Sequence, residues 1–269
     1  MEEYRLDVYL HINNFVESRE KAKQSIQNSC VYVNNKLITK TSFKVTNQDS
    51  IEVRQSFPYV GRGASKIEKA INFFKIDVNN KTAVDIGAST GGFTDFLLKN
   101  NARKVYAIDV GHDQLHQSLK TDERVVNLEN TNFRYIDSSI FKEQIDIIAA
   151  DVSFISLKLI LPKIAEISNS DTDIVVLIKP QFEAGRHNVG KNGIVKDKKI
   201  HEEVLNNVEK YCKESNLYLK NVTYSPIKGG DGNTEYLGHI KKGTNENTDV
   251  IKFKDLIIQA FDKKIEFKR

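Results

Sequence analysis

The sequence has little cysteine, no long apolar run and a net charge of only +4 over 269 residues. Its two cysteines, Cys30 and Cys212, form neither a disulfide framework nor a metal-ligand spacing, so we expect two reduced packing residues and no metal site. The longest apolar runs, such as residues 174–178, are far too short for a membrane helix, and the N-terminus lacks the apolar core of a signal peptide. We therefore expect a cytoplasmic protein with no membrane segment.

The small positive excess is concentrated in one part of the chain. Between Lys179 and Lys199 lie six basic and two acidic residues, an excess equal to that of the whole sequence. Such a run is most often a solvated loop, but it can also form a patch that attracts phosphate groups. Both interpretations stay open at this point.

A glycine-rich stretch follows an apolar segment near residue 85. Residues 83–86 run into Gly87, Gly91 and Gly92 before a helical segment. A strand, a glycine turn and a helix in succession indicate the first unit of a nucleotide-binding α/β fold, because glycine lets the backbone approach a ligand closely. Ser89 stands where the dinucleotide fingerprint G-x-G-x-x-G requires glycine, which disfavours a nicotinamide-dependent dehydrogenase.

The rest of the larger part alternates between strand-like and helix-like segments. This alternation predicts a mostly parallel sheet with helices on both faces. The predicted strands are 82–86, 104–109, 125–128, 145–150, 174–178, 219–225 and 235–240, and the predicted helices are 65–74, 92–100, 114–119, 157–167 and 198–214. Ser65 and Glu68 have the spacing of a capping box, so we expect Ser65 to be the N-cap of its helix.

Charged residues follow several of these strands. Ligands of such sheets bind beyond the carboxyl ends of the strands, which makes Asp85, Asp109, Asp151 and Lys179 candidate site residues, although such aspartates can also be helix caps. Asp109 ends the second strand, where an acidic side chain typically accepts hydrogen bonds from a ribose diol. Lys179 directly follows an apolar strand, and burial favours the neutral form of lysine, which can act as a base.

Two further charges are candidates for the same crevice. Lys66 would lie in the first turn of a helix, where a cation opposes the helix macrodipole, so it is either a functional cation or a surface lysine that points to solvent. Glu235 follows the glycine-rich turn 229–233 and would enter the crevice from there.

The first fifty residues have the pattern of a small separate module, followed by a linker with proline and glycine at 55–63. The predicted elements are an apolar segment at 6–12, a helix at 19–28 with Ser18 as its cap, and strands at 31–33, 37–38 and 50–53. Asn34 and Asn35 are typical of a tight turn, because asparagine tolerates the left-handed region.

This order resembles the S4-type RNA-binding domain of ribosomal proteins and pseudouridine synthases, through Arg5-Leu6-Asp7, Ser18-Arg19 and Val31-Tyr32-Val33-Asn34. Ser29 and Asn35 stand where members usually carry glycine, and both are small polar residues that the fold can accept. The resemblance implies that Arg5, Arg19, Lys21 and Lys23 face RNA phosphates. The alternative is that these side chains are only solvated, since residues 1–58 carry eight basic and seven acidic residues.

The whole chain is similar to the TlyA family, in which an S4-type domain precedes an FtsJ-like, S-adenosylmethionine-dependent ribose 2'-O-methyltransferase. The matching segments, in the family's order, are 61–66, 85–94, 151–156, 179–185 and 232–237, with Ala64 where relatives often have glycine. Members methylate ribosomal RNA, in some cases at cytidine 2'-hydroxyls, and the group has also been labelled hemolysin. The resemblance implies ribosomal RNA or ribosomal subunits as partners.

The resemblance also implies a fold and a division of the chain. The expected fold is α/β, a Rossmann-like methyltransferase with a seven-stranded, mostly parallel sheet, preceded by a small α+β S4-type domain. The expected divisions are an S4-type domain at 1–55, a linker at 56–64, a methyltransferase domain at 65–245 and a C-terminal helical tail at 246–269.

The resemblance further assigns the site residues. By motif, the Lys-Asp-Lys-Glu tetrad of FtsJ-like enzymes falls on Lys66, Asp151, Lys179 and Glu235. The expected pocket for S-adenosylmethionine consists of Asp85, Gly87, Ala88, Ser89, Thr90, Gly91, Gly92, Phe93, Asp109, Val110, Asn132 and Asp151. The expected RNA contacts outside the S4-type domain are Arg62, Arg186 and Lys191.

A tetrad of this kind suggests a mechanism. A ribose hydroxyl is a poor nucleophile until a base shares its proton, and we expect Lys179 to be that base, with its neutral form favoured by burial and by the second cation Lys66. Asp151 would orient Lys179, and Glu235 would hold Lys66 or the ribose. The competing classes are a non-catalytic ribosome-assembly factor that binds RNA, and a hemolysin, for which the sequence offers no membrane-inserting segment.

Overall fold

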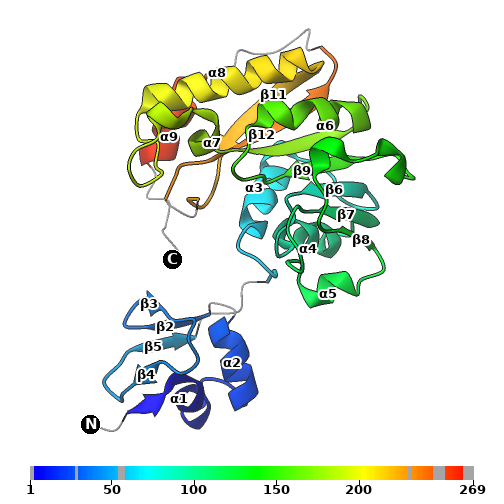
Figure 1. The fold of residues 1–269 in the computed structure, drawn as a ribbon. Coiled ribbons are helices and arrows are strands. Elements are labelled where there is room, and N and C mark those ends of the chain that lie inside the picture. The colour runs from blue at the N-terminus through cyan, green and yellow to red at the C-terminus, as the bar shows by residue number, and fades with distance from the viewer. Residues whose placement is uncertain (1–2, 28–29, 54–57, 230–231, 245–251, 263–269) are drawn as a thin grey trace. The chain divides into compact units, whose positions relative to one another are not determined.

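The computed structural model describes residues 3–27, 30–53, 58–229, 232–244 and 252–262. The chain forms two compact units, which divide between Pro58 and Tyr59 (Figure 1). The domain limits expected at residues 55, 64 and 245 stay predictions. Residues 56–57 of the expected linker and residues 246–251 and 263–269 of the expected tail lie outside the described residues, as do Ser29 and residues 230–231 of the glycine-rich turn.

The N-terminal unit is a small α+β module. Its elements are β1 (Tyr4–Arg5), α1 (Leu6–Ile12), α2 (Arg19–Gln27), β2 (Val31–Val33), β3 (Lys36–Leu37), β4 (Lys44–Val45) and β5 (Ile51–Val53). The Oγ of Ser18 accepts a hydrogen bond from the Lys21 N–H at 3.1 Å, as expected for the cap of α2. Asn34 and Asn35 have φ of 50° and 62°, which confirms the tight turn between β2 and β3. Leu6, Leu10, Ala22 and Ile26 of the two helices fill the core of this unit.

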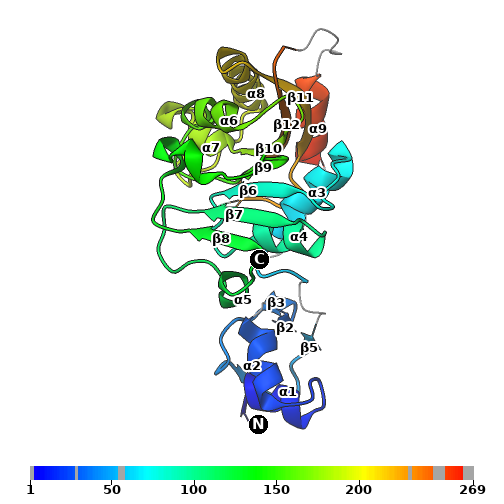
Figure 2. The ribbon, with the colours of Figure 1, turned by 90° about the vertical axis from the view of Figure 1, so that its right-hand side faces the viewer.

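The larger unit is built on a seven-stranded sheet, as predicted, and its strand order is β11-β12-β10-β9-β6-β7-β8 (Figure 2). Its strands are β6 (Thr82–Ile86), β7 (Lys104–Ile108), β8 (Val125–Leu128), β9 (Ile147–Ala150), β10 (Asp173–Ile178), β11 (Leu217–Tyr224) and β12 (Tyr236–Lys242). Five neighbouring strands run parallel, and β12 is antiparallel to both β10 and β11. The strand order reverses between β6 and β9, and a ligand crevice is expected beyond the carboxyl ends of those two strands.

Helices cover both faces of this sheet, which explains why its central strands are continuous apolar runs. One face carries α3 (Ala64–Phe74), α4 (Gly92–Lys99) and α5 (Gln117–Lys120). The other carries α6 (Leu161–Ile167) and α8 (Lys198–Glu214), while α9 (Phe253–Asp262) packs against α8 and the edge strand β11. Shorter elements are η1 (Phe133–Tyr135), η2 (Ser138–Ile140), η3 (Leu157–Leu159), α7 (Pro180–Glu183) and η4 (Arg186–Asn188).

Three predicted helix beginnings are wrong. No capping box forms, because α3 already begins at Ala64 with Gly63 as its N-cap, and the Oγ of Ser65 donates to the Arg62 carbonyl at 2.9 Å. The helix predicted at 114–119 is the shorter α5, which His116 caps by accepting from the Ser118 N–H. The segment 157–167 is divided into η3 and α6, because proline at the start of a helix is preorganised for the first turn and lacks the N–H that a continuing helix needs.

Candidate active site

The carboxyl edge of the sheet brings together the four residues of the expected tetrad. Asp151 follows β9, and Lys179 follows β10. Glu235 directly precedes β12, which pairs antiparallel with β10 and therefore begins at this same edge. Lys66 reaches the edge from the first turn of α3. These residues belong to four separate segments, so only the tertiary fold makes them neighbours.

Lys66 is a buried cation that contacts both carboxylates. Its Nζ donates to Glu235 Oε2 at 2.8 Å and lies 3.6 Å from Asp151 Oδ2, and the residue is 8% exposed. Burial lowers the pKa of Lys66 through desolvation, but the charges and hydrogen bonds of Asp151 and Glu235 outweigh this effect and raise the pKa overall. Lys66 therefore stays charged at neutral pH, which is a reason for a cation to occupy the unfavourable first turn of a helix.

Lys179 is held on the other side of the same aspartate. Its Nζ lies 2.6 Å from Asp151 Oδ1 and donates to Ser153 Oγ at 2.9 Å. We expected burial and a second cation to favour a neutral Lys179. A carboxylate also lies against each lysine, so the tetrad pairs two basic with two acidic side chains, and the neutral form of Lys179 stays a prediction.

Three buried side-chain oxygens of the described residues have no hydrogen-bond partner, and all three lie at this edge. They are Asp85 Oδ1, Asp151 Oδ1 and Gln181 Oε1. The ammonium of Lys179 is close to Asp151 Oδ1, but it is not aligned for a hydrogen bond. Buried polar atoms without partners are rare and costly in folded proteins. Their gathering at one edge of the sheet indicates a place for a polar ligand.

The glycine turn after β6 approaches the end of β9 closely. Gly87 has φ of 83°, and a Cβ at this position would lie 2.6 Å from the Asp151 carbonyl oxygen. Gly91 and Ser89 also have positive φ, of 93° and 49°. Because a side chain at Gly87 would collide with backbone, the turn keeps a narrow space between the ends of β6 and β9.

Two aspartates flank this turn. Asp85 is buried, and its Oδ2 accepts hydrogen bonds from the N–H and Oγ1 of Thr94 at 2.9 and 2.7 Å. Burial raises the pKa of Asp85 to about 7, even though the Thr94 bonds act in the opposite direction. Asp109 accepts from the N–H groups of Ser89 and Gly111, each at 2.7 Å, and so joins the end of β7 to the glycine turn.

The remaining expected pocket residues occupy different surroundings. Phe93 is buried in the apolar core. A Cβ on Gly92 would lie 3.2 Å from the backbone of Gly61 and Ala64. Phe93 and Gly92 therefore support the turn from its protein side. Ala88 is also buried, and the Thr90 carbonyl accepts from the His116 N–H at 3.2 Å. Val110 is exposed just beyond β7, and Asn132 caps η1.

The expected RNA contacts of the N-terminal unit all take part in ion pairs. Arg5 and Arg19 both contact the buried carboxylate of Asp7, each at 2.9 Å. Lys21 pairs with Glu17, and Lys23 pairs with Glu20 at 3.1 Å. The pairs of Lys21 and Lys23 lie at the surface, where ion pairs are weak enough for phosphate groups to replace a partner. Arg5 and Arg19 instead compensate the buried charge of Asp7. The RNA contacts of all four side chains stay a prediction.

The expected RNA contacts of the larger unit are exposed. Arg186 lies in η4, and Lys191 lies in the loop before α8, both within the basic segment that begins at Lys179. Arg62 is exposed just before α3. The basic segment begins at Lys179 of the tetrad, and its contact with phosphate groups stays a prediction.

Sequence reasoning missed three residues beside the tetrad. Ser153 contacts Lys179, and Gln181 donates to Glu235 Oε1 at 3.2 Å. Phe154 is 90% exposed with φ of 61°, and its ring centroid lies 5.0 Å from that of Phe182. An exposed aromatic residue in the left-handed region is unusual and is typical of a ligand contact. All three lie inside motif segments, but nothing in those segments singles them out.

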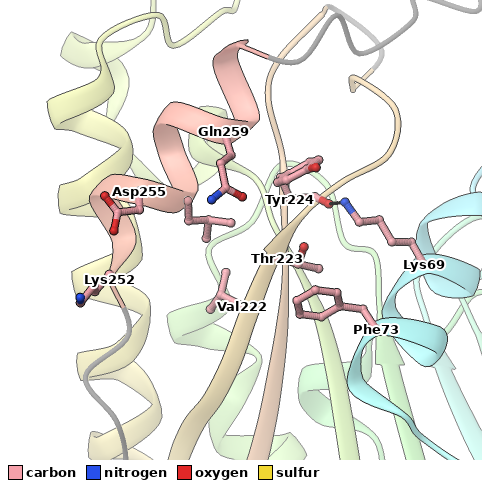
Figure 3. Close-up of a pocket in the computed structure, with 9 residues that line it drawn as sticks. Lys69, Phe73, Val222, Thr223, Tyr224, Lys252, Asp255 and Gln259 are labelled. Carbon is pink, nitrogen blue, oxygen red and sulfur yellow. Dashed lines mark hydrogen bonds between the residues drawn. The ribbon is translucent and has the colours of Figure 1, made fainter.

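A cavity of about 500 Å³ lies between α3, β11 and α9 (Figure 3). Lys69 and Phe73 of α3 line one wall, Val222, Thr223 and Tyr224 of β11 form the floor, and α9 contributes Gln259. Lys69 donates to the Tyr224 carbonyl oxygen and lies over the Tyr224 ring. The helix α3 therefore carries one lysine toward the tetrad and another, one turn later, toward this cavity.

Comparisons with known proteins agree with the geometry. Residues 59–242 match the family of FtsJ-like methyltransferases, and residues 5–51 match the S4 domain. Hemolysin A of Brachyspira hyodysenteriae is 48% identical, over 87% of this chain and 98% of that protein. The 16S/23S rRNA (cytidine-2'-O)-methyltransferase TlyA of Mycobacterium tuberculosis is 34% identical, over 96% of this chain and 97% of that protein. A solved structure from Streptococcus thermophilus with a hemolysin label has a TM-score of 0.76 and 40% identity, and covers 97% of this chain and 96% of that one.

Proposed function

Since this chain belongs to the FtsJ-like methyltransferase family and is an S-adenosylmethionine-dependent enzyme, we propose that it methylates ribose 2'-hydroxyls of ribosomal RNA. The observation that carries the proposal is the ion-paired Lys66–Asp151–Lys179–Glu235 tetrad at the carboxyl edge of the sheet. Cytidine is the nucleoside named for the Mycobacterium tuberculosis relative, and we infer the same preference here. The S4 domain supports an RNA substrate.

The residues of the crevice fit S-adenosylmethionine. When bound, this cofactor supplies an electrophilic methyl group on a positively charged sulfonium. Asp85 offers an unpartnered buried oxygen to a positively charged group, and Gly87 leaves the space that a side chain would fill. Asp109 stands at the end of β7, where its carboxylate oxygens can also accept from ribose hydroxyls. Asp85 through Gly92 would hold the amino-acid part and Asp109 the ribose.

Each tetrad residue has a role in activating the substrate hydroxyl. Lys179 takes the proton of the ribose 2'-hydroxyl at its Nζ, and Asp151, 2.6 Å away, orients that Nζ. Only an amine without the extra proton can accept the hydroxyl proton, so the reacting form of Lys179 is the neutral amine. Lys66 stays charged and holds Asp151 and Glu235 in place.

Positioning contributes more than proton transfer to the expected rate. Well-oriented reactants can remove roughly 7 to 11 kcal/mol of a barrier, whereas a general base contributes about a hundred- to ten-thousand-fold. Phe154 is placed to help with positioning, because an exposed aromatic ring three residues after Asp151 can stack on a nucleobase of the substrate. The basic segment with Arg186 and Lys191 would hold the RNA backbone.

The hemolysin label of some relatives does not lead us to a second proposal. None of the helices in the described part of the chain has the length and apolar character that crossing a bilayer requires. A non-catalytic assembly factor needs only RNA-binding surfaces, and it leaves the buried tetrad without a role.

The test is transfer of radiolabelled methyl groups from S-adenosylmethionine to ribosomal RNA and ribosomal subunits that lack this modification. We expect incorporation at one or a few cytidines, mapped as ribose methylation by resistance to alkaline hydrolysis. Tight RNA binding by the purified chain without any transfer, under conditions where the cofactor binds, would instead identify an assembly factor.

A further inference from the structure

Asn233 connects the turn before Glu235 to loop 190–195, which carries Lys191. Its side chain is fully buried, its Oδ1 accepts from the Val195 N–H at 3.0 Å, and its Nδ2 donates to the Gly193 carbonyl at 2.8 Å. The loop is closed on itself, because the Gly190 N–H donates to the Ile194 carbonyl at 3.1 Å. A single amide side chain therefore holds a preformed loop against the segment that carries Glu235.

His201 holds the same loop from its other side. It is fully buried in the first turn of α8, with Nε2 3.0 Å from the Val195 carbonyl oxygen and Nδ1 2.8 Å from the hydroxyl of Tyr236. A carbonyl only accepts, so Nε2 carries the proton and Nδ1 accepts from the tyrosine hydroxyl. Burial lowers the pKa of His201, which keeps the ring neutral and this arrangement intact at neutral pH.

These contacts converge on Glu235 from both directions in the sequence. Asn233 lies two residues before it, and Tyr236 directly follows it. Glu235 is held at both carboxylate oxygens, because Gln181 donates to its Oε1 at 3.2 Å and Lys66 donates to its Oε2 at 2.8 Å. A shift of loop 190–195 would therefore be transmitted to the carboxylate that holds Lys66.

We propose that Asn233, His201 and Tyr236 are positioning residues that fix loop 190–195 and Glu235 in one arrangement, so that RNA contact by Lys191 and alignment of the tetrad depend on each other. This inference rests on the proposed function. Lys191 is exposed on that loop, whereas the three positioning residues are buried and satisfied by one another and by the loop backbone. RNA that binds Lys191 thus binds a loop whose position relative to the tetrad is already fixed.

A double-mutant cycle tests this coupling. We expect Asn233→Ala to lower kcat roughly 10- to 100-fold with unchanged cofactor affinity, because small misplacements of catalytic groups have effects of this size. Lys191→Ala should raise the KM for RNA several-fold in the wild-type background and have little further effect in Asn233→Ala. The matched control is Lys252→Ala, an exposed lysine outside the loop, which should have the same small effect in both backgrounds.

Conservative variants separate positioning from folding. His201→Gln keeps one donor and one acceptor and should retain most of kcat. His201→Leu leaves the Val195 carbonyl and the Tyr236 hydroxyl without a partner, so it should lower the melting temperature and, assayed well below that temperature, should lose most of kcat. The inference would be overturned if Lys191→Ala had the same effect in the wild-type and Asn233→Ala backgrounds. Equal kcat values for His201→Gln and His201→Leu would also overturn it.

A readout without catalysis keeps this inference distinct from the proposed function. The Val195 amide donates to Asn233, so its hydrogen exchange should accelerate at least tenfold in Asn233→Ala, while exchange in the β6–β7 pair is unchanged. Failure of wild-type methyl transfer would refute the proposed function alone. Unchanged exchange at Val195 would refute the inference alone.

Discussion

The strands β10 and β12 carry a cluster of charges at each end. At the carboxyl end of β10, Lys179 and Glu235 join Lys66 and Asp151 in the tetrad. At the opposite end, Asp173 Oδ1 contacts His239 Nε2 at 2.8 Å and Lys241 Nζ at 3.1 Å. The same two strands thus present two ionic clusters whose residue types are similar.

The two clusters differ in how many of their side-chain polar atoms have hydrogen-bond partners. In the second cluster all side chains come from two adjacent strands, and Lys241 also donates to the Asp171 carbonyl at 2.8 Å. In the tetrad the side chains come from four segments, and Asp151 Oδ1 and the neighbouring Gln181 Oε1 have no hydrogen-bond partner. A structural cluster completes its own hydrogen bonds, whereas a reactive one keeps acceptors available at the cost of stability.

The largest expected difference between the clusters is in catalysis. Lys179→Met should lower the single-turnover rate of methyl transfer by about a hundred- to ten-thousand-fold, because it removes the proposed base. Lys241→Met, the matched change in the second cluster, should leave the rate within about twofold. Cofactor and RNA affinities measured in parallel exclude a binding defect. A wild-type rate for Lys179→Met would show that Lys179 is not the base.

Two lysines of α3 provide a similar contrast within one helix. Lys66→Ala leaves the carboxylate of Glu235 buried without its cation, and loss of one partner of a buried pair typically costs about 3–5 kcal/mol. We expect chemical denaturation to show a loss of this order, together with a loss of methyl transfer. Lys69→Ala, on the side of α3 that faces the cavity in Figure 3, should retain the wild-type rate. Equal loss of activity in both variants would mean that Lys66 acts only through helix stability.

Asp85 extends the comparison to the pH dependence of stability. Its pKa of about 7 lies above the ordinary value of 3.8, so the folded state binds this proton more tightly than the unfolded state. The folding stability that this bound proton contributes is fully present below the ordinary pKa and is lost as pH rises through about 7. We expect the free energy of unfolding of Asp85→Asn, relative to that of the wild type, to increase by a few kcal/mol as the pH rises from 5 to 8. Parallel unfolding curves for the two proteins at every pH would contradict this expectation.

Asp173 should show the opposite and smaller dependence. Burial raises the pKa of Asp173, but His239 and Lys241 outweigh burial and lower the pKa overall. The folding stability that the ionised Asp173 carboxylate contributes is present above the ordinary pKa and is lost as pH falls through the lowered pKa. Asp173→Asn should therefore cost about 1 kcal/mol at pH 7 and nothing in strong acid, with methyl transfer unchanged. A large loss of activity would remove the distinction between the two clusters.

Much of the architecture could be predicted because it depends on local patterns. The central strands are apolar runs such as residues 174–178, and the glycine turn after β6 needs φ values that few other residues adopt. The residue types of the tetrad were found by resemblance to family motifs. The capping box at Ser65 was wrong because the helical backbone already begins before Ser65, where Gly63 has α-helical angles and the Gly61 carbonyl accepts from the Ala64 N–H.

The sequence alone therefore determined the alternation of strands and helices, the glycine turn and the candidate charges, since each depends on residues close in the chain. Only the tertiary structure decided that Asp151 lies between the two lysines, that Gln181 and Ser153 belong to the site, and that Asn233, near Glu235, bonds loop 190–195. Lys66 and Glu235 are 169 residues apart, and their 2.8 Å contact depends on the antiparallel insertion of β12 beside β10. No local pattern encodes that distance, because it results from how all seven strands are ordered in the sheet.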